Sequence, residues 1–190
     1  MNIFITEDQR IPSPPIDIYS KLARDRILFI NDIEEKEAVD LVATLMLKDL
    51  EDPTTKITLL INSSGGDIRD VFMIHDVMQA LSAPIETICV GDAMNESVLL
   101  LASGTKGMRL ATENAFICPS QLSQDRYLHS DLANASDTLA RLTRDNDSLM
   151  TLLSKKTGKK KSKIVKDFER QQYFDVKQAK TYGLIDGVVQ

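Results

Sequence analysis

The chain has 190 residues, 43% of them hydrophobic and 27% charged, which is enough for one domain with a substantial core. Its net charge of −5 argues against a general nucleic-acid or membrane-surface binder. No apolar run reaches the roughly 18 residues of a membrane span, and the N-terminus lacks the basic and apolar segments of a secretory signal. Cys89 and Cys118 lie in apolar strand-like runs, which favours a reducing, cytosol-type compartment.

The first half of the chain predicts strands that alternate with helices. Prolines close the first fifteen residues, so we expect an arm over 1–15 outside a single domain over 16–190. The expected elements are a helix at 16–23, a strand at 26–30, helix 34–50, strand 57–61, helix 67–82, strand 85–90, helix 94–103 and strands 108–111 and 115–118. Continuous apolar strands between helices indicate an α/β fold with a buried, mostly parallel sheet.

The second half predicts one long helix from about 130 to 156. Its apolar positions follow a heptad rhythm, with Asn146 at the missing position: Leu132, Ala135, Leu139, Leu142, Leu149 and Leu153. So narrow an apolar stripe favours a helix that packs along a partner subunit. The alternative, that the helix packs on its own domain, is left open. A basic run over 155–163 is expected to form a solvated surface turn, and a last helix is expected near 175–182.

Two strand ends carry the chemical signals. Residues 61–67 (INSSGGD) form a glycine-hinged strand exit, and residues 91–97 (GDAMNES) lead into an apolar helix. The second segment has the pattern of a nucleophile elbow, in which one side chain is presented at a strand-to-helix turn. The residue at that point is Asn95, whose amide side chain cannot attack a carbonyl.

Five motifs in order resemble the ClpP family, the proteolytic subunits of Clp protease: residues 16–22 (IDIYSKL), 61–66 (INSSGG), 88–91 (ICVG), 100–107 (LLASGTKG) and 179–186 (AKTYGLID). The resemblance covers nearly the whole chain from Ile16. It implies a ClpP/crotonase-like spiral of β-β-α units with a long protruding handle helix. It also implies seven-membered rings stacked as a tetradecamer, with an AAA+ ATPase chaperone as a possible partner.

The resemblance places the catalytic serine, histidine and aspartate at Asn95, Ser120 and Gln171, with Gln172 the alternative for the third. A serine peptidase needs a hydroxyl, a base that takes its proton and an anion that orients the base. None of the three is present, so no catalytic residue is expected to function. The chain therefore resembles the degenerate ClpR-type paralogues that lack the triad.

The same resemblance assigns the oxyanion donors to the backbone N–H groups of Gly66 and Glu96. Backbone donors persist whatever the side chain, but the Glu96 carboxylate would repel an oxyanion if it pointed inward.

Two contact surfaces also follow from the resemblance. The ATPase-docking cleft maps to Thr58, Leu60, Ala80, Ile88, Val90 and Leu110, without the aromatic residues of the family. The ring–ring interface maps to Leu132, Leu139, Leu142 and Leu149.

We therefore expect a non-catalytic, structural or regulatory ring subunit in homo- or hetero-oligomeric rings, possible partners being an active ClpP paralogue and the ATPase. No cofactor, metal, nucleic acid or membrane partner is expected; the location is cytoplasmic, with a plastid or a viral source open. One alternative is an active serine-type endopeptidase with a non-standard nucleophile, Ser64, Ser97 or Ser120, or a Cys118–His129 thiolate pair. Another is a crotonase-like acyl-CoA enzyme using Glu96 or Asp92, whereas His75 is expected to pack in the core.

Overall fold

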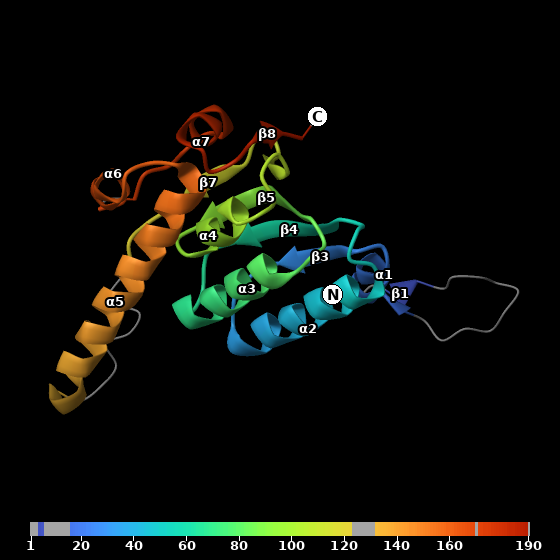
Figure 1. Ribbon diagram of the computed structural model, residues 1–190, viewed down its shortest axis with the longest axis horizontal. Helices are drawn as coiled ribbons and strands as arrows, with labels where there is room; N and C mark the ends of the chain where they lie inside the picture. The colour runs from blue at the N-terminus through green and yellow to red at the C-terminus, as the bar shows by residue number, and fades with distance from the viewer. Residues whose placement is uncertain (1–3, 6–15, 123–131, 170, 190) are drawn as a thin grey trace, which may run out of the picture.

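A parallel sheet with helices packed on it and one long helix projecting from its end make up the computed structural model, which describes residues 4–5, 16–122, 132–169 and 171–189 (Figure 1). In chain order the elements are β1 (Phe4–Ile5), β2 (Ile16–Asp17), α1 (Ile18–Arg24), β3 (Ile27–Ile30), α2 (Glu35–Glu51), β4 (Ile57–Ser63), α3 (Ile68–Ala80), β5 (Ile85–Met94), α4 (Ser97–Ala102), β6 (Arg109–Ala111), β7 (Phe116–Cys118), α5 (Leu132–Thr157), α6 (Lys161–Asp167), α7 (Val176–Tyr182) and β8 (Gly187–Val188).

The main sheet has the strand order β3-β4-β5-β6-β8, with β7 pairing with β5, and every pair in it is parallel. The expected α/β class with a mostly parallel sheet is confirmed. Strand β5 is longer than expected because its first half pairs with β6 and its second half, from Asp92 to Met94, pairs with β7. The strand predicted to end at residue 90 therefore ends at Met94, and the next helix begins at Ser97 instead of 94.

The core lies between the sheet and its helices. In β4, Ile57, Leu59 and Ile61 are fully buried, whereas the alternating Thr58 and Leu60 on the opposite face are only partly buried. Helices α2 and α3 pack against each other on one side of the sheet (Figure 1). All six residues of α4 are buried, as its continuous apolar sequence indicates. None of the helices within the described ranges is long and apolar enough to cross a membrane.

The N-terminal region contains a small separate sheet. Strand β1 pairs antiparallel with β2, and most of the expected arm lies outside the described residues. The helix predicted from residue 16 begins at Ile18, because Asp17 is its N-cap and accepts a hydrogen bond from the N–H of Ser20 at 3.0 Å.

The long helix α5 agrees with the predicted range, but its stripe faces inward. Leu142, Leu149 and Leu153 are buried by the chain's own domain, whereas Leu139 is 45% exposed. The burial of Leu142 and Leu149 favours the alternative that the stripe packs on its own domain, and the ring–ring interface stays a prediction. Leu139 remains available to a partner, and the side chain of Leu132 lies outside the described residues.

The basic run over 155–163 contains the predicted turn at residues 158–160, between the end of α5 at Thr157 and the start of α6 at Lys161, but α6 itself was not predicted. Ile164 and Phe168 are buried beneath this helix and hold it on the domain, so its lysines occupy the outer face. Helix α7 begins with a capping box between Asp175 and Gln178, as its sequence suggests.

A buried ion pair, which we call the anchor, ties β6 to the C-terminal segment. The guanidinium of Arg109, 1% exposed, donates to both carboxylate oxygens of Asp186 at 2.8 and 2.6 Å and to the carbonyls of Ala102 and Lys156. Lys106 and the N–H of Gly107 also contact the Asp186 carboxylate. The hydrogen bonds from Arg109, with those from its neighbours, hold the pKa of Asp186 well below its usual range.

Candidate functional site

The glycine loop, residues 64–67, follows β4 and leads into α3. Its backbone pairs with Ile33, whose N–H donates to the Gly65 carbonyl and whose carbonyl accepts from the N–H of Asp67, both at 3.3 Å. A β-carbon on Gly66 would lie 2.1 Å from the Ile33 carbonyl oxygen, so glycine is required there on steric grounds. Asp67 caps α3 by accepting from the N–H of Arg69.

The elbow, residues 91–97, turns sharply between β5 and α4. Asn95 has a φ of 53°, in the left-handed region that few non-glycine residues adopt. Its N–H donates to the Cys118 carbonyl at 2.8 Å, which ties the turn to the end of β7. The backbone therefore has the strained bend of a nucleophile elbow, and the structure confirms the turn predicted from sequence.

Two of the three triad positions are brought together. The hydroxyl of Ser120 donates to Oδ1 of Asn95 at 2.7 Å, and Nδ2 of Asn95 donates to the Ser64 carbonyl at 2.8 Å. These bonds occupy the amide of Asn95 from both sides with neutral partners. The arrangement holds the loop, the elbow and the segment after β7 together, and no ionisable side chain takes part in these two bonds.

The third position lies on a neighbouring segment. An antiparallel bridge joins Ile117 to Phe174. Ser120 lies three residues after Ile117 in the sequence, and Gln171 lies three residues before Phe174. The bridge is isolated, and the next hydrogen bond between the two segments, from the N–H of Gln121 to the Phe168 carbonyl, is out of its register, so Gln171 and Gln172 both stay candidates for the third position. The Gln171 side chain is exposed and hydrogen-bonds to no other residue in the described part of the chain.

The Glu96 side chain points into the site. It is 2% exposed, and its Oε2 accepts a hydrogen bond from the N–H of Gly66 at 3.4 Å. The same oxygen lies 2.5 Å from where a β-carbon on Gly65 would stand, so the carboxylate is packed against the glycine loop. The sequence placed Glu96 beside the donor, and only the structure shows that it contacts it.

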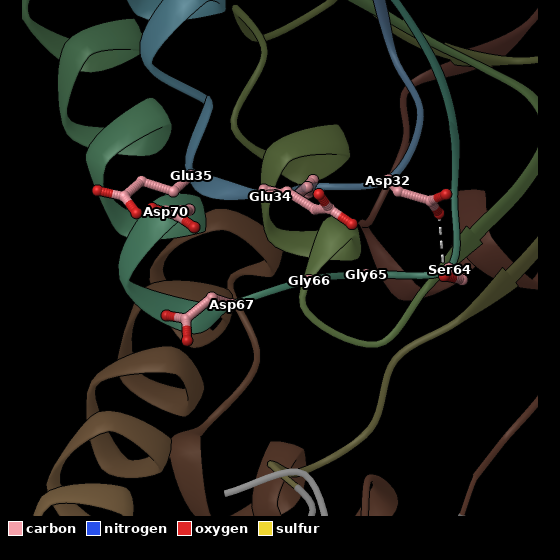
Figure 2. A pocket seen from close by; sticks show the side chains of 9 residues that line it. Asp32, Glu34, Glu35, Ser64, Gly65, Gly66, Asp67 and Asp70 are labelled. Carbon is pink, nitrogen blue, oxygen red and sulfur yellow. Dashed lines mark hydrogen bonds between the residues drawn. The ribbon is translucent and has the colours of Figure 1, made fainter. Parts of the chain in front are cut away.

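An open depression of about 670 Å³ borders the glycine loop, and no motif in the sequence predicted it (Figure 2). Five carboxylates line it together with Ile33, Ser64, Gly65 and Gly66: Asp32, Glu34, Glu35, Asp67 and Asp70. Burial raises the pKa of Asp70, with further contributions from Asp67 and Glu35. The sequence feature that could have indicated this depression is the group of acidic residues at the starts of α2 and α3, whose N-termini meet here. Within the described ranges, no group of three His, Cys, Asp or Glu is placed to hold a metal.

The alternative nucleophiles lack a suitable setting. Ser97 is fully buried and donates to the Met94 carbonyl at 2.7 Å. Ser64 is exposed, but its hydroxyl contacts only the Asp32 carboxylate, 3.4 Å away, among the described residues (Figure 2). Burial raises the pKa of Cys118, which opposes a thiolate, and His129 lies outside the described residues. Asp92 is exposed and its N–H donates to Asn62.

The handle helix supports the segment that carries Ser120. Asn146 on α5 accepts from the N–H of Leu122 at 3.1 Å, and its Nδ2 lies 3.3 Å from Oε1 of Gln121. The break that Asn146 makes in the heptad stripe therefore has a structural reason, because its amide holds this segment.

The docking candidates mostly share one face of the sheet. Leu60, Ile88 and Leu110 are paired across β4, β5 and β6, and each is partly buried. Thr58 and Val90 lie two residues away on the same strands, and Ala80 is exposed at the end of α3. Phe29, 39% exposed, pairs with Leu60 on β3 and contacts the Tyr19 ring, so an aromatic residue borders this row after all.

The family model for Clp protease matches residues 13–190 of this chain. The chain belongs to the Clp protease family. ATP-dependent Clp protease proteolytic subunit 2 of Frankia casuarinae is 39% identical over 176 residues, covering 92% of this chain and 80% of the relative. Subunit 1 of Mycolicibacterium paratuberculosis is 34% identical over 173 residues, covering 90% and 82%. Subunit 2 of Mycobacterium tuberculosis is also 34% identical, covering 90% and 81%.

Proposed function

We propose that this Clp protease family member is a non-catalytic ring subunit, which contributes structure or regulation to a Clp proteolytic complex. The relatives bear the name of ATP-dependent proteolytic subunits, which supports assembly into a protease that an ATPase serves. The single observation that carries the non-catalytic assignment is the hydrogen bond from Ser120 to Asn95. It joins two neutral side chains at the positions where a peptidase needs a nucleophile and its base.

Physical chemistry supports the same conclusion. An amide has no nucleophilic lone pair of useful basicity, and a serine hydroxyl does not act as a base near neutral pH. In a comparable triad, removal of the nucleophile alone lowers turnover on the order of a million-fold, and further losses add little. We therefore expect Asn95, Ser120 and Gln171 to maintain the local structure and not to catalyse hydrolysis.

Assembly is tested by co-expression with a catalytically intact paralogue from the same genome. The tagged chain should enter rings with that paralogue, and native mass spectrometry should give the composition. Leu139→Glu is the matched disruptive variant, because Leu139 is the exposed member of the handle stripe. Failure of the tagged wild-type chain to enter any mixed ring would contradict the regulatory role.

Catalysis is tested on the purified oligomer of this chain alone. We expect neither cleavage of a fluorogenic peptide nor labelling by a fluorophosphonate probe. Labelling mapped to Ser64, the exposed hydroxyl beside Asp32, would instead support the alternative endopeptidase.

A further inference from the structure

We propose that Glu96 is a built-in anion that occupies the oxyanion site of this chain and holds the glycine loop closed on it. In an elbow-type site the oxyanion is bound by the N–H after the nucleophile position and by an N–H from a facing loop. The facing loop here is the glycine loop, and its Gly66 N–H already donates to the Glu96 carboxylate. The site is thus blocked by a residue of its own chain.

The geometry fits a permanent occupant. Glu96 is 2% exposed, although it immediately precedes α4 and its side chain could have turned to solvent. Its Oε2 lies within contact distance of Gly65 and hydrogen-bonds to Gly66, so it touches the two residues whose backbone forms the hinge. A buried carboxylate needs hydrogen-bond donors to offset its desolvation, and the Gly66 N–H, 3.4 Å away, is one of them.

The local sequence permits this contact. Asn95 fixes the bend through the hydrogen bonds of its backbone N–H and of both ends of its side-chain amide, and this directs the next side chain toward the glycine loop. Gly65 leaves the space that the carboxylate fills, because any β-carbon there would collide with Oε2. Glu96 and the two glycines therefore form one packed unit.

The consequence extends beyond the missing triad. A peptide carbonyl, and above all a tetrahedral oxyanion, would meet a negative charge where it needs a donor. Loss of one oxyanion donor lowers turnover by about 10² to 10³-fold in a working enzyme. Restoration of Ser, His and Asp at positions 95, 120 and 171 should therefore leave a block that only a fourth substitution removes.

The inference rests on the proposed function in taking the elbow as a degenerate acyl-transfer site, but its first test needs no activity. Residues 65–66 are the only Gly-Gly pair in the chain. Labelling with 1-¹³C and ¹⁵N glycine therefore makes the Gly66 amide the single glycine signal with carbonyl coupling. The signal is compared in the wild type, Glu96→Gln and Glu96→Met, with Glu113→Gln as the control at an exposed carboxylate.

We expect the Gly66 proton to shift upfield in Glu96→Met, less so in Glu96→Gln, and not in the control. A Gly66 signal that is the same in wild type and Glu96→Met would overturn the proposal.

The second test compares the Asn95→Ser/Ser120→His/Gln171→Asp variant with and without Glu96→Met. We expect fluorophosphonate labelling to be at least 100-fold faster in the fourfold variant. Equal measurable rates in the two variants would overturn the block. Peptide cleavage by the wild-type chain would refute the proposed function and leave the Gly66 result intact, so the two failures are distinguishable.

Discussion

The elbow and the anchor are two polar clusters of one chain, and their polar atoms are hydrogen-bonded by different kinds of partner. At the anchor, Asp186 receives Arg109 on both oxygens and Lys106 on one. At the elbow, the Asn95 amide is held by the Ser64 carbonyl and the Ser120 hydroxyl, both neutral. An ion pair thus joins β6 to the C-terminal segment, whereas the matched positions that would have to carry charge during hydrolysis hold neutral side chains. The fold therefore depends on paired charges at the anchor, whereas neutral hydrogen bonds hold the elbow.

The largest expected effect comes from breaking the anchor. Arg109→Met should lower the free energy of unfolding by about 3–5 kcal/mol, because it leaves the Asp186 carboxylate without its bidentate partner. Lys106→Met is the control: its side chain is exposed, so its loss should cost at most about 1 kcal/mol. Urea denaturation measures both, and equal effects would contradict the assigned role of Arg109.

The next effect tests the glycine loop by sterics alone. Gly66→Ala places a β-carbon 2.1 Å from the Ile33 carbonyl oxygen, so the loop must move, and we expect a loss of about 2–3 kcal/mol. Gly107→Ala is the matched control, since its φ of 91° adds strain but its β-carbon meets no atom. It should lose about 1 kcal/mol. Thermal unfolding of both variants tests whether the close approach at Ile33 is real.

A third prediction concerns a buried group that lacks full pairing. His75 is 4% exposed, as expected for a core residue, and its Nε2 has no hydrogen-bond partner within the described ranges. Burial lowers the pKa of His75, Lys156 and Lys155 lower it further, and the Asp76 carboxylate acts in the opposite direction.

Because the folded-state pKa lies below the ordinary value of 6.5, the unfolded chain takes up the proton first. Stability is therefore complete above about pH 6.5 and declines below it, with a slope of at most about 1.4 kcal/mol per pH unit. In His75→Phe this part of the slope should disappear. Denaturation between pH 7.5 and 5 measures it, and an unchanged slope would assign the effect to other groups.

The smallest expected effect is on activity. Asn95→Ser alone should restore no peptide cleavage, because Ser120 and Gln171 still supply neither base nor acid. Recovery in a fluorogenic assay would mean that these two residues have been misplaced. The same variant should lose about 1 kcal/mol of stability, because serine tolerates the left-handed angle of position 95 less well than asparagine.

Much of the fold follows from local sequence. The apolar runs predicted the parallel strands, and Asp67 predicted the start of α3. Helix α6 was missed because its lysines hide a short apolar face made by Ile164 and Phe168. The length of β5 was missed because pairing with β7 carries it past Gly91, and such pairing is not encoded locally.

At the candidate site, the family resemblance supplied residue positions, but it could not supply the contacts between them. Spacing from Asn95 located Ser120, and the structure joins the two. The direction of Glu96 depends on the bend before it and on the space over Gly65, which are tertiary features. The same holds for the handle stripe: a heptad pattern states that Leu142 and Leu149 are covered, but not whether the cover is a partner or the chain's own core.

The left-handed backbone at Asn95 has a consequence for heat resistance. Active sites commonly retain strained residues because their chemistry requires them, and stability suffers for it. Asparagine accommodates this angle better than most residues with a β-carbon, so the bend survives here at lower energy. The choice of asparagine at position 95 therefore adds to the heat resistance of the folded chain, independently of what the elbow does chemically.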